Sequence, residues 1–242
     1  MKKTLILLFV VIFTTLFTTG AFAGWKLYDD FDSYVDIAEL KASGKWFINA
    51  EDEAIANFSI ENGSLKIEHI AGNPDDSAWA VLINKANKIK GVRATMEVES
   101  WDGDVRARIG ADIGVLSENS DNLVWLQMQL RSRPGSFYEE TVRGSVSVLN
   151  IPTDWANVYD LFYTELGAGK NFVAGVPYTI ETKWSKKQVY FSVKDPDDIG
   201  NVKFKFIEKI NYIDEPFRAI GTRSSDDDGT CVVYIDDVYV IK

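Results

Sequence analysis

Two-residue alternation of apolar and polar side chains runs through most of the chain in short stretches. Gly, Asn, Asp and Pro separate these stretches, which is the pattern of antiparallel β-strands with one buried face. The predicted strands cover residues 25–31, 57–60, 64–69, 79–83, 92–101, 105–116, 122–130, 137–149, 157–166, 178–184, 188–193, 202–206, 217–222 and 232–241. So many strands do not fit one open sheet, and the sequence therefore predicts an all-β, two-sheet antiparallel sandwich of jelly-roll type.

A few segments depart from alternation. Val35, Ile37 and Leu40 do not alternate, so a short helix is predicted over residues 33–42, and a single turn over residues 153–156. Asn62-Gly63 and Asp102-Gly103 stand between alternating runs and are typical of tight hairpin turns.

Three consecutive strands in the middle of the chain have a strongly specified register. Their apolar sets are the even positions of 92–98, the odd positions of 105–115 and the even positions of 124–130. A shift by one residue would bury charged side chains, so the apolar sets should face the second sheet. Because the connections are short, we expect the three strands to pair as a meander.

The opposite face of this meander carries the candidate binding site. Its members are polar or aromatic, namely Trp101, Trp125, Gln127, Gln129, Arg106, Arg108, Glu97 and Glu99. Indole rings stack on the C–H face of a sugar, and amide, guanidinium and carboxylate groups pair with its hydroxyls. An ordinary solvated sheet face with cross-strand ion pairs is the alternative.

A catalytic interpretation of the same face rests on Glu97 and Glu99, which lie about 7 Å apart along one strand. Paired carboxylates at such a spacing serve glycoside cleavage. The predicted neighbours Arg106 and Arg108 would keep both ionised, whereas a catalytic acid needs a raised pKa. His69 is a candidate base, although its place at the end of an apolar strand favours a structural role.

The composition of the chain excludes several classes of binding partner and site. The 242 residues carry a formal net charge of −10, which argues against nucleic acid and anionic membranes as partners. One His and one Cys exclude a His-rich zinc site and an intramolecular disulfide. Cys231 lies in an apolar run and is predicted to be a buried, inert thiol.

The first 23 residues have the pattern of a signal peptide. Lys2 and Lys3 precede an apolar run, and the small residues Ala21 and Ala23 mark a cleavage site before Gly24. We therefore expect an exported protein, periplasmic or extracellular, without membrane insertion after cleavage. Residues 24–242 contain no linker or repeat and are predicted to form a single β-sandwich domain.

Several segments resemble the concanavalin A-like lectin/glucanase superfamily. They are the opening WKLYDDF at 25–31, GKW at 44–46, GSLKI at 63–67, GVPYTI at 175–180 and the closing YIDDVYV at 234–240. The resemblance implies two antiparallel sheets, adjacent termini and a concave face that often holds glycans. The fold hosts lectins, hydrolases, lyases and structural modules, so it does not define the activity.

One motif of this superfamily is missing. Laminarinase-type glucanases carry Glu-x-Asp-x-(x)-Glu on one strand. The nearest stretch, at residues 97–102, reads EVESWD and lacks the central aspartate and the final glutamate. This departure argues against glucanase activity.

Acidic residues gather near the end of the chain, at 226–228 and 236–237, and near its start at 29, 30 and 32. The resemblance would bring both ends together, and carboxylates in loops suit calcium. Asp30 and Asp237 are the first candidates for a structural calcium ion. A solvated acidic turn, with Asp side chains bonded to the backbone, is the alternative.

The sequence thus predicts an exported, lectin-like module that binds a glycan or polysaccharide and does not cleave it. A polysaccharide hydrolase or lyase that uses Glu97 and Glu99 is one alternative. A non-catalytic structural or interaction domain of the cell envelope is another. The sequence does not define the glycan or the oligomeric state.

Overall fold

A computed structural model describes residues 24–50, 56–70, 76–117, 120–132, 134–135, 140–150, 155–160, 172–194, 200–205, 210–211, 217–224 and 229–242. The predicted signal peptide lies outside these residues. The strands that they form are β1 (Lys26–Asp29), β2 (Trp46–Ala50), β3 (Ala56–Glu61), β4 (Ser64–His69), β5 (Ser77–Leu82), β6 (Gly91–Asp102), β7 (Val105–Ser117), β8 (Ser120–Arg131), β9 (Thr141–Asn150), β10 (Trp155–Asp160), β11 (Pro177–Trp184), β12 (Gln188–Val193), β13 (Gly200–Lys205), β14 (Ile210–Asn211), β15 (Arg218–Ser224) and β16 (Thr230–Ile241). A helix, α1 (Ile37–Ala42), and a 3-10 turn, η2 (Ala86–Lys88), accompany them.

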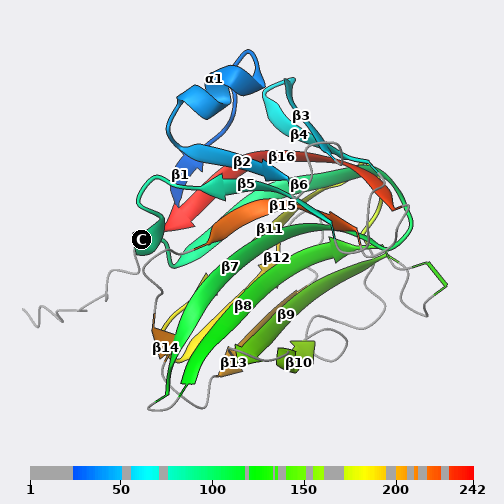
Figure 1. Ribbon diagram of the computed structural model, residues 1–242. Coiled ribbons are helices and arrows are strands. Elements are labelled where there is room, and N and C mark those ends of the chain that lie inside the picture. Colours follow the sequence, from blue (N-terminus) through cyan, green and yellow to red (C-terminus); the bar gives the residue numbers. More distant parts are fainter. Residues whose placement is uncertain are drawn as a thin grey trace, which may run out of the picture.

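The strands form two eight-stranded antiparallel sheets. Sheet A has the order β13-β12-β11-β6-β16-β4-β3, with β1 also pairing β16, and sheet B has the order β10-β9-β8-β7-β15-β5-β2, with β14 pairing β7. In Figure 1 the long strands β7, β8 and β9 of sheet B run side by side in the front layer. The predicted all-β jelly-roll sandwich is confirmed.

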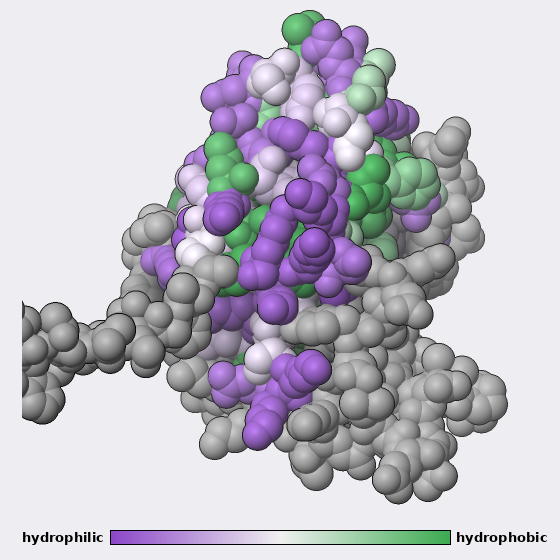
Figure 2. Space-filling view, turned by 90° about the vertical axis from the view of Figure 1, so that its left-hand side faces the viewer, coloured by the Kyte–Doolittle hydropathy of each residue, from purple (hydrophilic) through white to green (hydrophobic). Residues whose placement is uncertain are grey.

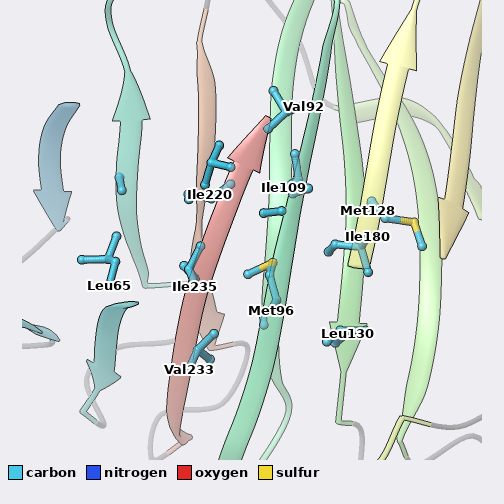
Figure 3. Close-up of a cluster of buried hydrophobic side chains, with 14 of the residues drawn as sticks. Leu65, Val92, Met96, Ile109, Met128, Leu130, Ile180, Ile220, Val233 and Ile235 are labelled. Atoms are coloured by element: carbon cyan, nitrogen blue, oxygen red, sulfur yellow. The ribbon is translucent and has the colours of Figure 1, made fainter. Parts of the chain in front are cut away.

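The core lies between the two sheets and follows the predicted alternation. Val92, Met96, Ile180, Val233 and Ile235 of sheet A are fully buried. Facing them in Figure 3 are buried side chains of sheet B, among which Ile109, Met128, Leu130 and Ile220 are labelled. Burial of this aliphatic layer is the main source of stability, since each large side chain contributes about 1.5–3 kcal/mol.

The two ends of the described chain are joined in sheet A. β1 pairs with β16 in antiparallel register, with Lys26 opposite Val240 and Leu27 opposite Tyr239. This agrees with the adjacent termini that the family resemblance implies. α1 lies at one end of the sandwich (Figure 1), with Asp36 as its N-cap accepting a hydrogen bond from the Glu39 backbone N–H.

Some local predictions need correction. β2 is not among the predicted strands, and neither is the short β14. The helix begins at Ile37 rather than at residue 33. Of the turn predicted at 153–156, residues 153 and 154 lie outside the described part, while Trp155 and Ala156 begin β10.

The two predicted hairpin turns have different outcomes. Asn62 and Gly63 have φ angles of 52° and 79° and connect the paired strands β3 and β4. Left-handed angles at both central residues are those of a tight hairpin. Asp102 is instead the last residue of β6 in sheet A, and Gly103 begins the short connection to β7 in sheet B, which carries the chain from one sheet to the other.

The described surface on one flank of the sandwich is mainly polar. Figure 2 shows one flank, where hydrophilic residues cover most of the described surface and hydrophobic ones lie between them. Among the described residues, no helix is long and apolar enough to cross a membrane.

Candidate functional site

The outer face of sheet B, directed away from the core, carries the main concentration of polar candidates. In β7, Ala107 and Ile109 are buried in the core, so Arg106 and Arg108 belong to the other face. Arg108 is directly opposite Gln129 of β8 and Gly221 of β15. Residues that oppose one another across strands share a face. Arg108, Gln129 and, through Gly221, Trp79 of β5 therefore form one row.

A second row on this face consists of arginines. Arg106 of β7 is opposite Arg131 of β8 on one side and Arg223 of β15 on the other. Arg143 of β9 is opposite Gln129 and adds a further guanidinium. We call the outer-face set of Arg106, Arg108, Arg131, Arg143 and Arg223 the arginine face.

Asp104 and Asp76 border the arginine face. The Arg131 guanidinium forms a bidentate ion pair with Asp104, in which Nε donates to Oδ1 at 2.8 Å and Nη2 donates to Oδ2. Arg106 Nε lies 4.0 Å from Asp104 Oδ1. Asp76, 9% exposed, precedes Ser77 at the start of β5.

The neighbouring positive charges affect the pKa of Arg106. Burial lowers the pKa of its guanidinium to about 9, and the charges of Arg131, Arg223 and Arg143 act in the same direction, while Asp104 opposes them. Arginine in water titrates well above this range. The guanidiniums of the arginine face therefore lie close enough to influence one another's charge.

Arg108 is the most enclosed member of this face, with a side chain that is 0% exposed. Its Nη2 donates to Ser77 Oγ at 2.7 Å and its Nη1 to Gln127 Oε1 at 3.4 Å. The guanidinium carbon lies 3.9 Å from the ring centroid of Trp79, a cation–π contact. Hydrogen bonds on two sides and an indole beneath fix the orientation of this charge.

Gly221 makes room for this arrangement. A Cβ atom at residue 221 would lie 2.0 Å from the Ala78 carbonyl oxygen and 2.9 Å from Trp79 Cε3. Trp79 also packs edge-to-face against Phe217, with the ring centroids 5.2 Å apart. The glycine therefore lets the indole lie across β15 toward Arg108.

Two glutamines complete the polar layer. Gln127 is 6% and Gln129 1% exposed, and Gln129 Nε2 donates to Gln127 Oε1. The Oε1 atom of Gln129 is buried and accepts no hydrogen bond from any residue that the structure describes. A buried acceptor of this kind has capacity for a donor such as a hydroxyl group.

The predicted meander is wrong for its first strand. β7 and β8 pair as expected, but β6 pairs with β11 and β16 in sheet A. The outer faces of the two sheets point in opposite directions. Glu97 and Glu99 therefore do not share a face with Arg106, Arg108, Gln127 and Gln129, and the arginines are not neighbours of the glutamate pair.

Trp101 is also not on the predicted face. A β-bulge in β6 places Val98 opposite Val233 and Ser100 opposite Val232, so that Glu99 is an extra residue. The bulge reverses the alternation and puts Trp101 opposite the buried Cys231. The Trp101 ring is partly buried against the core, with its centroid 5.1 Å from that of Phe172. The role of Trp101 as an outward sugar platform is thus not supported.

Trp125 is described only in its backbone. It is opposite Asp112 of β7 and Ser147 of β9, two positions before Gln127 on β8. Its side chain lies outside the described part of the structure, so its predicted role in stacking stays a prediction.

His69 and Cys231 are structural, and both lie on the core side of sheet A. His69 is 2% exposed, and its Nδ1 is 3.0 Å from Thr222 Oγ1 in sheet B. Burial lowers the pKa of the imidazole to about 4; Asp76 opposes this shift and Arg108 adds to it. Cys231 is a buried free thiol, as predicted, and burial raises its pKa to about 12.

The predicted calcium ligands lie where the chain ends meet. Asp29 is opposite Val238, so Asp30 and Asp237 directly adjoin the β1–β16 pair. Burial raises the pKa of the nearby Asp236, the backbone N–H of Asp237 lowers it, and the charges of Asp237, Asp32 and Asp30 raise it further. Within the described residues, however, no three His, Cys, Asp or Glu side chains are arranged to hold a metal ion.

The sequence analysis missed Trp79, Arg131 and Arg223 as members of the site. Arg131 continues the alternation of Gln127 and Gln129 along β8, so the local pattern contained that signal. Trp79 and Arg223 belong to β5 and β15, which are distant from β7 in sequence. Only strand pairing brings them together.

Comparison with known proteins defines the fold. Neither the protein-family models nor the curated proteins match the sequence. Among solved structures, porphyranase B from Zobellia galactanivorans aligns with a TM-score of 0.56 and 13% identity, covering 90% of this chain and 94% of that one. A Bacteroides ovatus mixed linkage glucan GH16 protein in complex with a product aligns with a TM-score of 0.50 and 10% identity, over 88% and 98%.

A sialidase aligns as well, with a TM-score of 0.51 and 17% identity, covering 90% of this chain. The chain spans 18% of that sialidase, so the similarity concerns one part of the larger protein. With the two-sheet topology, these similarities establish a concanavalin A-like jelly roll. At such identities they define the fold and not the activity.

Proposed function

We propose that the protein binds a carbohydrate on the outer face of sheet B and does not cleave it. The observation that carries this proposal is the buried cluster of Arg108, Gln127 and Gln129, whose planar groups are held by one another and by Ser77. Planar amide and guanidinium groups pair well with adjacent hydroxyls. Fixed binding groups lose little conformational entropy when a ligand arrives.

Two similarities in fold support the sugar class. One solved structure with this fold is called a porphyranase, and another is a GH16 protein in complex with a product. Trp125 remains part of the proposal as a stacking residue next to this cluster, as predicted from the sequence.

The groups at the centre of this face favour binding over cleavage. Glycoside hydrolysis ordinarily requires two carboxyl groups that flank the scissile bond. Around the described part of the arginine face, Asp104 is held by two hydrogen bonds from Arg131, and Asp76 lies at the start of β5. The central cluster of Arg108, Gln127 and Gln129 offers amides and a guanidinium instead.

The test measures binding and turnover on one panel of neutral and acidic polysaccharides. We expect saturable binding by titration calorimetry and no release of reducing ends. The Gln129→Ala variant should bind at least about tenfold more weakly, because a buried hydrogen-bonding side chain is lost. Thr95→Ala, on the outer face of sheet A, is the matched control and should bind as the wild type does.

Other outcomes would favour the alternatives. Release of reducing ends that Glu97→Gln abolishes would identify a hydrolase or lyase centred on sheet A. Absence of binding to every polysaccharide, together with capture of an envelope protein, would favour a structural or interaction domain. Equal binding by Gln129→Ala and the wild type would move the site away from sheet B.

Two further predictions are part of the proposal. Export requires removal of residues 1–23, and N-terminal sequencing of the exported protein should then begin at Gly24.

A structural calcium ion at Asp30 and Asp237 would relieve the repulsion among the aspartates around Asp236. Calcium should then raise the thermal unfolding midpoint of the wild type but not of Asp237→Asn, and an unchanged wild-type midpoint would reject the ion.

A further inference from the structure

One flank of the sandwich collects lysines from four segments that are distant in sequence. The segments are 24–28, 83–93, 183–190 and 238–242, and none of them contains Asp or Glu. Their exposed lysines, which we call the lysine flank, are Lys26, Lys85, Lys88, Lys90, Lys186, Lys187 and Lys242. The C-terminal end of the chain lies on the left in Figure 1, and Figure 2 shows this flank, with hydrophilic side chains across its centre.

Strand pairing holds these segments side by side. The Lys90 N–H donates to the Ile241 carbonyl at 2.7 Å, and the Trp184 N–H donates to the Lys90 carbonyl at 2.8 Å. Lys90 therefore lies between the end of β16 and the turn from β11 to β12, which carries Lys186 and Lys187. The lysines of three segments are thus neighbours at the ends of these strands.

The charges of this flank act on one another. Lys26 is opposite Val240, two residues before Lys242. Burial lowers the pKa of Lys242, and the charges of Lys85, Lys26 and Lys88 lower it further. The ion pairs that lysines form with Asp or Glu side chains in the described part of the chain involve positions 45, 66, 183 and 194, and none of the seven. The lysine flank therefore presents positive charge to solvent.

Exposed aliphatic side chains accompany these lysines. Leu27, 50% exposed, follows Lys26, and Ile83, 47% exposed, is two positions before Lys85. Cations beside exposed apolar side chains are typical of surfaces that bind the interface of a bilayer, where the cations stay among the headgroups and the apolar groups reach the acyl boundary. A polyanion in water would pair with the charges and leave the aliphatic groups unused.

The same flank adjoins the predicted export signal. Gly24 is two residues before Lys26, and the apolar run of the signal peptide lies within residues 1–23. A signal peptide is held at the membrane until it is cleaved. The lysine flank is therefore the part of the domain that is joined to the bilayer during export.

We propose that the lysine flank docks the exported protein on a bilayer that carries anionic phospholipid headgroups, with the lysines among the phosphates and with Leu27 and Ile83 at the acyl boundary. The net charge of −10 argues against this partner for the chain as a whole, but it is an average over the surface. Acidic groups farther than about 8 Å from the headgroups are screened at physiological salt, whereas each lysine at the surface is attracted. The arginine face takes no part in this contact, so the inference does not depend on the proposed function.

The test measures co-sedimentation with vesicles. The protein is purified after export, and N-terminal sequencing confirms that it begins at Gly24, so that residues 1–23 do not contribute to binding. Vesicles of phosphatidylcholine are compared with vesicles of phosphatidylcholine and phosphatidylglycerol in equal amounts. We expect at least about tenfold tighter binding to the anionic vesicles, with loss of binding at high salt. Equal binding to both kinds of vesicle overturns the proposal.

Lysine variants locate the contact. Lys88→Gln and Lys90→Gln should each weaken binding to anionic vesicles about fivefold, because each removes one attracted charge. Lys41→Gln is the matched control, since Lys41 is an exposed lysine of α1 outside the flank, and it should bind as the wild type does. A melting curve for each variant confirms folding. Equal loss of binding for Lys41→Gln and Lys88→Gln would overturn the assignment to this flank.

Variants of the aliphatic residues separate a bilayer from a soluble polyanion. Leu27→Ser and Ile83→Ser leave the charge unchanged and should each weaken vesicle binding at least about threefold, whereas Val35→Ser, at a residue that is 80% exposed and precedes α1, should not. Dextran sulfate is the soluble probe. If it binds as tightly as the anionic vesicles, and Leu27→Ser and Ile83→Ser change nothing, the flank recognises a polyanion and the bilayer is rejected.

The two proposals fail separately. Gln129→Ala should bind vesicles as the wild type does, and Lys88→Gln should leave polysaccharide binding unchanged. Absence of polysaccharide binding therefore leaves membrane docking in place, and absence of vesicle binding leaves the proposed carbohydrate site in place.

Discussion

Arg108 and His69 are buried polar side chains that approach sheet B from opposite faces. The Arg108 guanidinium is contacted by Ser77, Gln127 and the Trp79 ring. His69 lies between the sheets, where the hydroxyl of Thr222 is 3.0 Å away and water is excluded. Burying a polar side chain away from water costs free energy. The contacts around Arg108 offset this cost, whereas the imidazole of His69 avoids it by staying neutral.

His69 should make stability depend on pH. Its pKa is about 4 in the folded protein against 6.5 for an ordinary histidine, so between these values only the unfolded chain binds the proton. Stability should therefore fall as the pH drops from 6.5 to 4, by about 3 kcal/mol in total. Urea unfolding measured across this range tests the prediction.

The control is His69→Gln, which removes the only histidine. Its stability should change less steeply over the same pH interval, since carboxylates alone remain to titrate. If the two proteins show the same slope, His69 is not a neutral buried group.

At the scale of elements, a local irregularity in a strand can make a prediction wrong even where the surrounding alternation is interpreted correctly. The alternation in β6 correctly predicted the burial of Val92, Ala94, Met96 and Val98. The bulge at Glu99 then reversed the face of Trp101, and nothing in the local alternation signals an extra residue. β2 was missed because Trp46, Phe47 and Ile48 are consecutive apolar residues without alternation.

Asp29 connects elements of the two sheets. The carboxylate, 2% exposed, accepts hydrogen bonds from Trp46 Nε1 at 2.7 Å and from the Tyr34 hydroxyl at 2.8 Å, and pairs with Lys45 Nζ at 3.3 Å. Because β1 is in sheet A and β2 in sheet B, the bond to Trp46 holds the sheets together at this end.

Replacement of Asp29 by Asn should destabilise the protein by about 2–4 kcal/mol. Both carboxylate oxygens face donors, so the amide NH₂ of Asn would oppose a donor in either orientation. Denaturant unfolding measures the loss. The exposed Asp102→Asn is the control and should change stability by less than about 0.5 kcal/mol. A similar effect for both variants would contradict the role of Asp29.

At the scale of the whole molecule, the assignment of strands to sheets separates the two sets of candidate residues. Glu97 belongs to the outer face of sheet A and Arg106 to that of sheet B, with the core between them. Packed sheets are about 10 Å apart, before the side chains on their outer faces are added. The two groups should therefore be energetically independent.

A double-mutant cycle of Glu97→Gln and Arg106→Gln tests this separation. Their effects on unfolding free energy should add to within about 0.5 kcal/mol. A coupling above about 1 kcal/mol would mean that the two residues share a face, as in the meander predicted from sequence. Arg131→Gln with Arg106→Gln is the positive control, because both residues approach Asp104.

The sequence by itself determined most of the strands, the buried alternation of β6 up to Val98 and of β7 and β8, the antiparallel jelly-roll class and the buried thiol of Cys231. These features depend on neighbours along the chain, since side chains alternate between faces with a period of two. Tertiary structure alone decided which strands lie side by side. Trp79, Arg108 and Arg223 meet because β5, β15 and β7 pair across long sequence separations, and Glu97 is excluded because β6 crosses to the other sheet. Pairing is settled by the packing of both sheets around a common core, and a local pattern contains no information about that competition.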